Sequence, residues 1–326
     1  MKSILKLLAL NCAIFFVSCS GETSTEVNQN QIKDDFTYIT VNSTGKINKI
    51  GNNTGAISSY SEFNGVNPSS FLNLNTISSN ANKIFLVEHL PPKDKLFVFD
   101  KNTNSTISKE LIYPIAITGT EPTLVSLQWN ELTNQLFAVI ASNPNLNGDD
   151  LCYFVTINLV NFEVNYTGIS FNQKGSFSTF INDNKFYSTS INDQTIEINP
   201  ENNTSKPLRF NSTNSSVLFT KAGMSSNNIL FGVKAATGNV IGVSLVKFDL
   251  TSNITTAILP NEVYGIINSS GKGFIDKTNN QYVNYVIKEK QTGLLKYNIS
   301  SNSTEFVAVN KSGIDNNMII IEKASN

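Results

Sequence analysis

Short apolar runs separated by polar turn residues follow one another from about residue 36 to the end of the chain. The runs are rich in β-branched and aromatic residues and are bounded by Asn, Gly, Ser or Thr, which is typical of strands. No stretch carries a helical stripe, and the runs are too closely spaced for crossover helices, so antiparallel sheets are predicted. The pattern therefore predicts an all-β chain. The clearest predicted strands are 83–88, 96–99, 136–140, 153–157, 229–233 and 282–287.

One turn pattern recurs six times: an apolar residue, then Asp, Asn or Gly, then a small polar turn. Such a turn predicts a hairpin in which an Asx side chain caps the turn and a Gly or Asn takes the left-handed position. The intervals of 41 to 58 residues are close to the length of a four-stranded propeller blade. We therefore expect a six-bladed β-propeller, with a seven-bladed ring as the alternative. The second residues of the six turns are Gly51, Asp100, Asn158, Asn199, Asp249 and Asn298.

The two ends of the repeat region together supply one further blade. Residues 298–326 and 36–51 add up to about one period, so N- and C-terminal strands are expected to share the first blade. Residues 318–322 would form its innermost strand, and the other strands would lie between Phe36 and Phe63. Closing the ring in this way removes an open sheet edge.

These repeats resemble those of the broad Asp-x-x-Thr-Gly class of propellers, which includes quinoprotein-like and YncE-like folds. The resemblance covers most of residues 36–326, but only the turns carry it, so it implies a fold and no substrate. Quinoprotein repeats usually add a Trp after the Gly, whereas Trp129, elsewhere in the pattern, is the single Trp of this chain. A quinone cofactor is therefore not expected.

The N-terminus has the pattern of an export signal. Lys2 and Lys6 precede the apolar run 7–17, which is too short to span a bilayer but suits the core of a signal peptide. We predict a signal peptide over residues 1–18, a polar tether over 19–35 and the propeller over 36–326.

The junction at the end of that signal resembles the lipobox of bacterial lipoproteins. Val17 and Ser18 precede Cys19 as in that motif, although Phe16 stands where an aliphatic residue is usual. The resemblance implies that Cys19 is diacylated and becomes the mature N-terminus, which would anchor the protein stably. We expect an extracytoplasmic lipoprotein of the outer membrane or cell surface; the alternative is cleavage after Ser20 and secretion.

Composition narrows the range of partners. Hydrophobic residues make up 40% of the chain, charged residues 15%, and the net charge is −1, so no basic patch is expected to bind nucleic acid. Asparagine accounts for 47 of the 326 residues and is suited to turns, because it tolerates the left-handed conformation and its side chain can cap the backbone. Once Cys12 leaves with the signal and Cys19 carries lipid, Cys152 remains alone in an apolar run. It is therefore expected to be a buried small hydrophobe in a chain without disulfides. We also expect a monomer.

Candidate catalytic groups are few. His89 is the single histidine, which excludes a multi-histidine metal site. Residues 143–150 have the outline of a calcium loop, but Phe154 stands where the bidentate Glu belongs, so no cofactor is predicted and Ca²⁺ is kept as the alternative. Trp129 is expected either to pack between blades or to form a platform for a sugar.

The favoured function is a recognition module for an extracytoplasmic protein, glycan or peptide, and the alternative is a calcium-dependent propeller hydrolase or lactonase. The connections between second and third strands differ in every blade, whereas the six aligned turns repeat. Function tends to collect on irregular loops, so we expect a ligand on the face that carries these connections and the crossings between blades. The candidate ligand-binding residues are Glu88, His89, Tyr113, Asp149, Asp150, Lys234, Tyr264 and Lys288.

Overall fold

The computed structural model describes residues 35–67, 72–143, 150–173, 178–189, 194–209, 219–225, 227–235, 242–259, 262–265, 271–309 and 318–324. The predicted signal segment and Cys19 lie outside these residues. The described residues form six four-stranded antiparallel sheets and one short 3-10 helix, η1 (Leu74–Thr76), which confirms the all-β prediction. Among the helices of this described part, none has the length and apolar character needed to span a membrane.

Each sheet is one blade, whose strands are named from the innermost to the outermost. Blade 1 has β24 (Met318–Lys323), β1 (Phe36–Asn42), β2 (Lys46–Gly51) and β3 (Ile57–Glu62). Blade 2 has β4 (Ile77–Ser79), β5 (Lys83–Leu90), β6 (Lys93–Asp100) and β7 (Ser105–Glu110). Blade 3 has β8 (Thr123–Asn130), β9 (Gln135–Ala141), β10 (Asp150–Ile157) and β11 (Val164–Gln173).

The second half of the ring repeats this plan. Blade 4 has β12 (Ser178–Asn182), β13 (Lys185–Thr189), β14 (Gln194–Asn199) and β15 (Thr204–Arg209). Blade 5 has β16 (Phe219–Met224), β17 (Ile229–Ala235), β18 (Val243–Asp249) and β19 (Ile254–Ala257). Blade 6 has β20 (Phe274–Asp276), β21 (Gln281–Lys288), β22 (Gln291–Asn298) and β23 (Ser303–Ala308).

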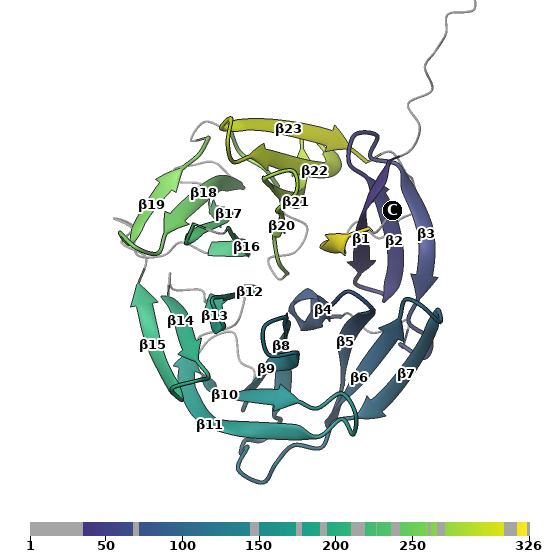
Figure 1. Cartoon of the computed structure of the whole chain (residues 1–326), viewed down its shortest axis with the longest axis vertical. Coiled ribbons are helices and arrows are strands. Elements are labelled where there is room, and N and C mark those ends of the chain that lie inside the picture. The colour runs from purple at the N-terminus through teal and green to yellow at the C-terminus, as the bar shows by residue number, and fades with distance from the viewer. Residues whose placement is uncertain are drawn as a thin grey trace, which may run out of the picture. The chain divides into compact units, whose positions relative to one another are not determined.

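The six blades stand in a ring around a central axis, so the fold is the predicted six-bladed β-propeller (Figure 1). Blade 1 is closed by both termini: β24 pairs antiparallel with β1, with Val41 opposite Ile319 and Tyr38 opposite Lys323. This closure places the C-terminal strand innermost, as the sequence predicted.

The six aligned turns all connect the third and fourth strands of a blade. In blade 2, Asp100 Oδ1 accepts hydrogen bonds from the backbone N–H groups of Asn102 and Thr103, and Asn104 has a left-handed φ of 51°. Blades 4, 5 and 6 repeat both features, with left-handed Asn residues at the same place. Blade 3 keeps the cap, but Phe162 occupies the left-handed position with φ 63°.

Blade 1 lacks an Asx residue at this turn and obtains its cap from elsewhere in the chain. Gly51 stands at the Asx position, and the Asp35 carboxylate accepts from the N–H of Asn53 at 2.9 Å and from the Thr54 hydroxyl at 3.2 Å. The residue just before the first strand thus replaces the missing side chain.

The core is divided among the junctions between blades. Each of the six buried apolar clusters in the described residues draws its side chains mainly from two neighbouring blades. The largest joins blades 2 and 3 and includes Phe85, Leu127 and Tyr153. A fully buried side chain of this size contributes about 1.5–3 kcal/mol. The ring is therefore held by sheet-to-sheet packing, which leaves the two ends of the axis for function.

Antiparallel pairing gives the ring two distinct faces. We call the face with the first-to-second and third-to-fourth turns the hairpin face; it includes the turn of residues 101–104. We call the other the crossing face; it carries the second-to-third connections and the links between blades, such as residues 90–93 and 111–122.

Candidate functional site

The crossing face carries the predicted ligand-binding residues that the structure describes. Glu88 and His89 lie at the end of β5, Asp150 begins β10, and Lys234 and Lys288 lie at the ends of β17 and β21. Tyr113 and Tyr264 lie in links between blades. Cys19 and Asp149 lie outside the described residues.

His89 and Tyr113 meet at one buried carboxylate between blades 2 and 3. His89 Nδ1 is 2.6 Å from Asp94 Oδ1, which favours the tautomer that donates from Nδ1. Asp94 Oδ2 also accepts from the Tyr113 hydroxyl and, at 2.6 Å, from the backbone N–H of Leu124. Burial, followed by the Asp94 charge, raises the pKa of Tyr113 far above its usual range. Because the Asp94 side chain has no exposed surface, we interpret this group as a structural clamp.

Tyr264 and Lys288 form a second group between blades 5 and 6. Lys288 Nζ lies 3.4 Å from Glu262 Oε2 and 5.9 Å from the centroid of the Tyr264 ring. The Tyr264 hydroxyl donates to the same carboxylate, and burial is the largest cause of its raised pKa. The backbone of Tyr264 also bridges to Val243, so this link is fixed against blade 5.

The other predicted residues join neither group. Glu88 is 1% exposed, and its Oε1 accepts from the N–H of Asn67 at 2.9 Å. Asp150 Oδ1 accepts from the Ser142 hydroxyl and the N–H of Asn143, which closes its own loop. Lys234 lies in the β17–β18 ladder opposite Ser244. The structure thus gathers the predicted residues as two pairs, and their role in ligand binding stays a prediction.

Cys152 and Trp129 have structural roles. Cys152 is 4% exposed, and burial raises the pKa of its thiol to about 12, which suppresses the reactive thiolate. The Trp129 ring stacks on Phe85 of blade 2 with centroids 5.7 Å apart, and the backbone N–H of Trp129 donates to the Ser78 hydroxyl. Trp129 therefore packs between blades, one of its two predicted roles.

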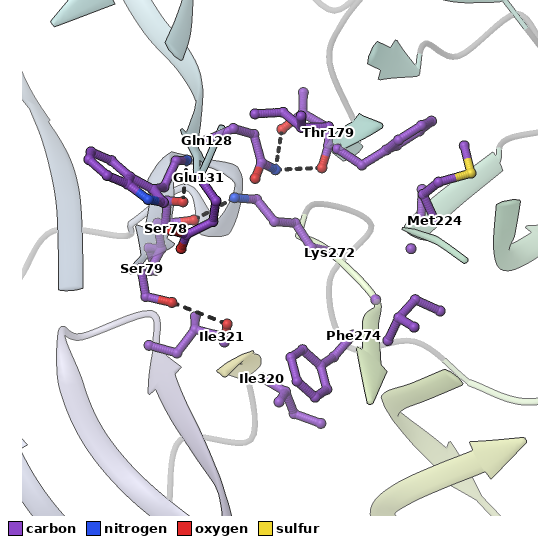
Figure 2. A pocket seen from close by; sticks show the side chains of 18 of the residues that line it. Ser78, Ser79, Gln128, Glu131, Thr179, Met224, Lys272, Phe274, Ile320 and Ile321 are labelled. Atoms are coloured by element: carbon purple, nitrogen blue, oxygen red, sulfur yellow. Dashed lines mark hydrogen bonds between the residues drawn. The ribbon is translucent and has the colours of Figure 1, made fainter. Parts of the chain in front are cut away.

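A hollow that the sequence does not predict lies at the hairpin-face end of the axis, opposite the crossing face. A cavity of 340 Å³ is lined by residues of the innermost strands and of the turns that follow β8 and β20, and so belongs to the hairpin face (Figure 2). Every blade contributes to it. Its lining includes Ser79, Gln128, Thr179, Met224, Phe274 and Ile321.

Lys272 reaches across the ring axis at this cavity. It belongs to the segment that enters β20 of blade 6, yet its Nζ donates to the carbonyl oxygens of Ile77 in blade 2 and Leu127 in blade 3, both at 2.7 Å (Figure 2). Blades 6 and 3 stand opposite each other in a six-bladed ring. The side chain thus spans the axis, and its ammonium group is fixed by two strands of the far side.

The flanking glycines make this position of Lys272 attainable. Gly271 has φ of +107°, and a Cβ there would lie 2.7 Å from Ile319 Cγ2. A Cβ on Gly273 would lie 2.3 Å from the carbonyl oxygen of Lys221. Both contacts are shorter than side chains tolerate, so the backbone approaches the axis closely only with glycine at these positions.

Two opposing effects act on the Lys272 amine. Burial lowers the pKa of Lys272 to about 7, because desolvation disfavours the charged form. The two carbonyl acceptors favour the charged form, since both accept from the ammonium. Gln128 is positioned in a similar way, as its Nε2 donates to the carbonyl and the hydroxyl of Thr179.

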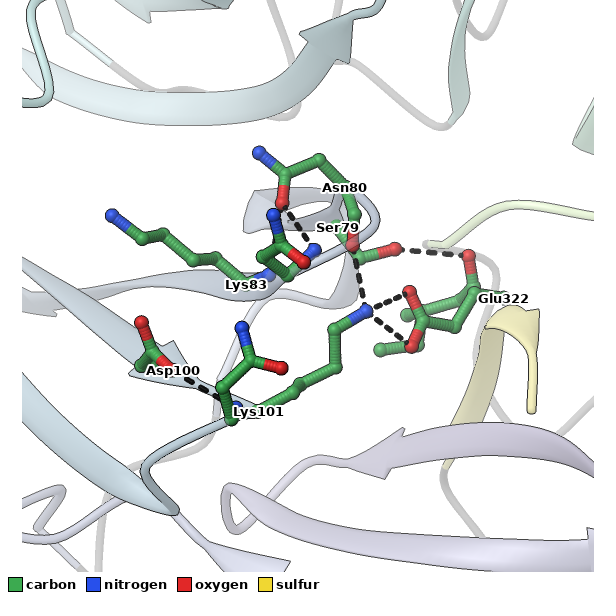
Figure 3. Close-up of polar contacts among 9 residues, drawn as sticks. Ser79, Asn80, Lys83, Asp100, Lys101 and Glu322 are labelled. Carbon is green, nitrogen blue, oxygen red and sulfur yellow. Dashed lines mark hydrogen bonds and ion pairs between the residues drawn. The ribbon is translucent and has the colours of Figure 1, made fainter. Parts of the chain in front are cut away.

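A second hollow of 570 Å³ adjoins the cavity at blades 1 and 2. The two share Ser79, Glu131, Phe274 and Ile321. Lys101 and Glu322 are part of its lining. Lys101 Nζ lies 2.7 Å from Glu322 Oε1 and donates to the carbonyl of Asn80 (Figure 3). Burial raises the pKa of Glu322, and the Lys101 charge counteracts this only in part.

The sequence carried a weak signal for this site. Lys272 stands between two glycines directly before an apolar pair, which places a cation where a strand begins and the backbone can approach closely. Its contacts with residues about 145 and 195 positions away cannot be read from spacing. No group of three or more His, Cys, Asp or Glu side chains in the described part of the chain is arranged to hold a metal ion.

Comparison with known proteins shows a similarity in fold and none in sequence family. No protein-family model and no curated protein sequence matches the chain. Among solved structures, TolB from Acinetobacter baumannii is similar with a TM-score of 0.54 at 11% identity, over 84% of this chain and 64% of the TolB chain. An oligogalacturonate lyase in complex with manganese gives 0.51 at 10% identity, over 81% and 70% of the two chains. Identities this low show the propeller fold alone.

Proposed function

We propose that the protein is an extracytoplasmic recognition module that binds its ligand in the central cavity of the hairpin face. The observation that supports this proposal is the cavity itself. All six blades contribute to it, and Lys272 is held in it by hydrogen bonds across the axis. A volume of 340 Å³ falls at the lower end of the range of small-molecule sites, about 300–1,000 Å³.

The lining supports binding because its polar groups are already in place. Gln128 is held by a backbone carbonyl of the neighbouring blade 4, Lys272 by carbonyls of blades 2 and 3 across the axis, and Ser79 donates to the carbonyl of Ile321 at 3.2 Å. Groups fixed before binding lose little conformational entropy when a ligand arrives. Strands form most of the wall, and a site built on strands is more precise than one on loops.

The proposal includes the two predictions made from the N-terminal sequence, an export signal and a lipid anchor at Cys19. The tether of residues 19–35 would hold the propeller outside the membrane, and the adjoining hollow of 570 Å³ would admit a ligand larger than the cavity. The neighbouring TolB and lyase structures fit either a binding or a catalytic role, so the cavity itself is the reason to favour binding.

The experiment is a fragment screen by ligand-observed NMR on the wild type and two matched variants. Ile181→Trp fills the cavity, because Ile181 is half-buried in its lining. Ile254→Trp makes the same change on the outermost strand β19, where Ile254 is 58% exposed. We expect fragments that bind the wild type to be lost with Ile181→Trp and retained with Ile254→Trp. The same fragments binding all three proteins would contradict the proposed site.

A further inference from the structure

The Lys272 ammonium is a fixed cation at the inner end of the cavity. An ammonium has three donors, and two of them serve the carbonyls of Ile77 and Leu127. The third has no acceptor among the described residues, and Lys272 is part of the cavity lining. One charged donor is therefore left for a ligand.

The cavity wall is polar near this donor and apolar on the opposite side. Figure 2 shows Met224, Phe274, Ile320 and Ile321 on the side of the cavity away from Gln128. A fixed cation on one side and apolar side chains on the other fit a ligand with one anionic group and an apolar body, because each buried part of such a ligand then meets its complement. The apolar lining residues are Ile77, Phe180, Ile181, Met224, Phe274, Ile275, Ile320 and Ile321.

We propose that the cavity binds a small organic acid with an aromatic or branched aliphatic body, whose carboxylate accepts a hydrogen bond from the Lys272 ammonium. This inference rests on the proposed function and names the ligand class of the same site. The volume of 340 Å³ favours a free small acid over a longer chain. The C-terminal carboxylate of a peptide is the competing ligand.

Lys272 is the cation that a ligand inside the cavity would meet, because the other charged lining residues lie in exposed turns. Glu131 and Lys277 also line the cavity, but both are exposed residues of turns on the hairpin face. One is negative and the other positive, so together they add no net charge. From β16, Lys221 lies on the other side of Gly271, with its Nζ 3.0 Å from where a Cβ on Gly271 would stand. The lining residues from β4, β12 and β24 are uncharged.

The test compares two probes of equal shape, 4-phenylbutanoate and 4-phenylbutanamide, by isothermal titration calorimetry with the full chain. A hydrogen bond to a charged group predicts that the acid binds roughly 10- to 100-fold more tightly than the amide. Lys272→Met should remove this preference. The matched control Lys277→Met should keep it.

A second measurement does not depend on the folding of a variant. Loss of the ammonium charge as pH rises from about 6 to about 9 should weaken binding of the acid and leave binding of the amide unchanged. The carboxylate of the probe stays ionised throughout this range. The acid-to-amide ratio should follow the same profile with Lys221→Met, which removes the other buried amine.

The outcomes separate this inference from the proposed function. Equal affinities for acid and amide, both lost with Ile181→Trp, would leave the binding site intact and overturn the choice of ligand. No binding of the acid at millimolar concentration would also overturn it. Tighter binding of acetyl-Gly-Gly-Phe than of 4-phenylbutanoate would identify the peptide carboxylate instead. Binding of the acid that Ile181→Trp leaves unchanged would place it elsewhere and contradict both proposals.

Discussion

At the scale of single residues, the molecule is organised by buried polar groups that reach across blades. Asp94 collects the ring of His89, the hydroxyl of Tyr113 and the N–H of Leu124 on one carboxylate with no exposed surface. Sequence reasoning selected His89 and Tyr113 as binding candidates because both lie in irregular connections. It could not foresee Asp94 as their shared partner, since the pairing depends on the register of β5 with β6.

Replacing Asp94 tests whether this group is a clamp. Asp94→Asn should lower the free energy of unfolding by about 2–4 kcal/mol, because donors from three elements lose a buried charged acceptor. Urea denaturation measures the change, and Asp183→Asn, in an exposed turn, is the matched control with almost no expected loss. A loss below about 1 kcal/mol for Asp94→Asn would contradict the clamp.

The buried amines predict how stability depends on pH. Burial lowers the folded-state pKa of Lys221 and of Lys272 to about 7, whereas an unfolded lysine titrates near 10.4. Between about pH 7 and pH 9 the unfolded chain therefore binds more protons, and the free energy of unfolding should rise with pH, by at most about 1.4 kcal/mol per pH unit for each amine. Lys221→Met should reduce this slope in urea denaturation, while Lys277→Met should leave it unchanged. A flat profile for the wild type would count against the burial of these amines.

At the scale of elements, the turn repeat was the most informative part of the sequence. All six aligned turns proved to join third and fourth strands, and the Asx caps and left-handed Asn residues follow the expected chemistry. Local chemistry of this kind can be read because donor and acceptor lie two or three residues apart. The cap from Asp35 in blade 1 could not be read, because it comes from 18 positions away.

The closing strand β24 is attached to blade 2 as well as to β1. Lys101 and Glu322 pair across this junction with side chains that are 12% and 17% exposed. Lys101→Met should cost about 3 kcal/mol, since it leaves the Glu322 carboxylate in a desolvated site without its cation. Glu322→Gln should cost less, and the double variant should be closer to the wild type than Lys101→Met is. Losses that simply add in urea denaturation would show that the pair is not coupled.

At the scale of the whole molecule, the sequence predicted the ring and its closure. It favoured the crossing face for function, a prediction that is still untested, whereas the cavity of the proposed site belongs to the hairpin face. The crossing face was favoured because its loops vary, and loop variety can be read from sequence. A cavity depends on how the ends of six inner strands approach one axis, which no local pattern encodes. Lys272 was not among the candidates from the sequence for this reason, although its two glycine neighbours indicated a close approach of the backbone.

The N-terminus makes a separate prediction for the whole chain. The junction Ser18-Cys19-Ser20 predicts a mature protein that begins at Cys19 and carries a diacylglyceryl group and an N-acyl chain. Intact-mass analysis of protein isolated from its native membranes should find that lipidated form, and Cys19→Ser should abolish it. A mature chain that starts at Gly21 without lipid would show that the protein is secreted instead.

The most direct test of a ligand site in the central cavity is a crystal structure of the protein soaked with 4-phenylbutanoate. We predict density in the cavity of the hairpin face, with a carboxylate oxygen within hydrogen-bonding distance of Lys272 Nζ and the phenyl ring against Phe274 and Met224. Ligand density on the crossing face, beside Asp150 or Lys288, together with an unchanged cavity, would contradict the central claim.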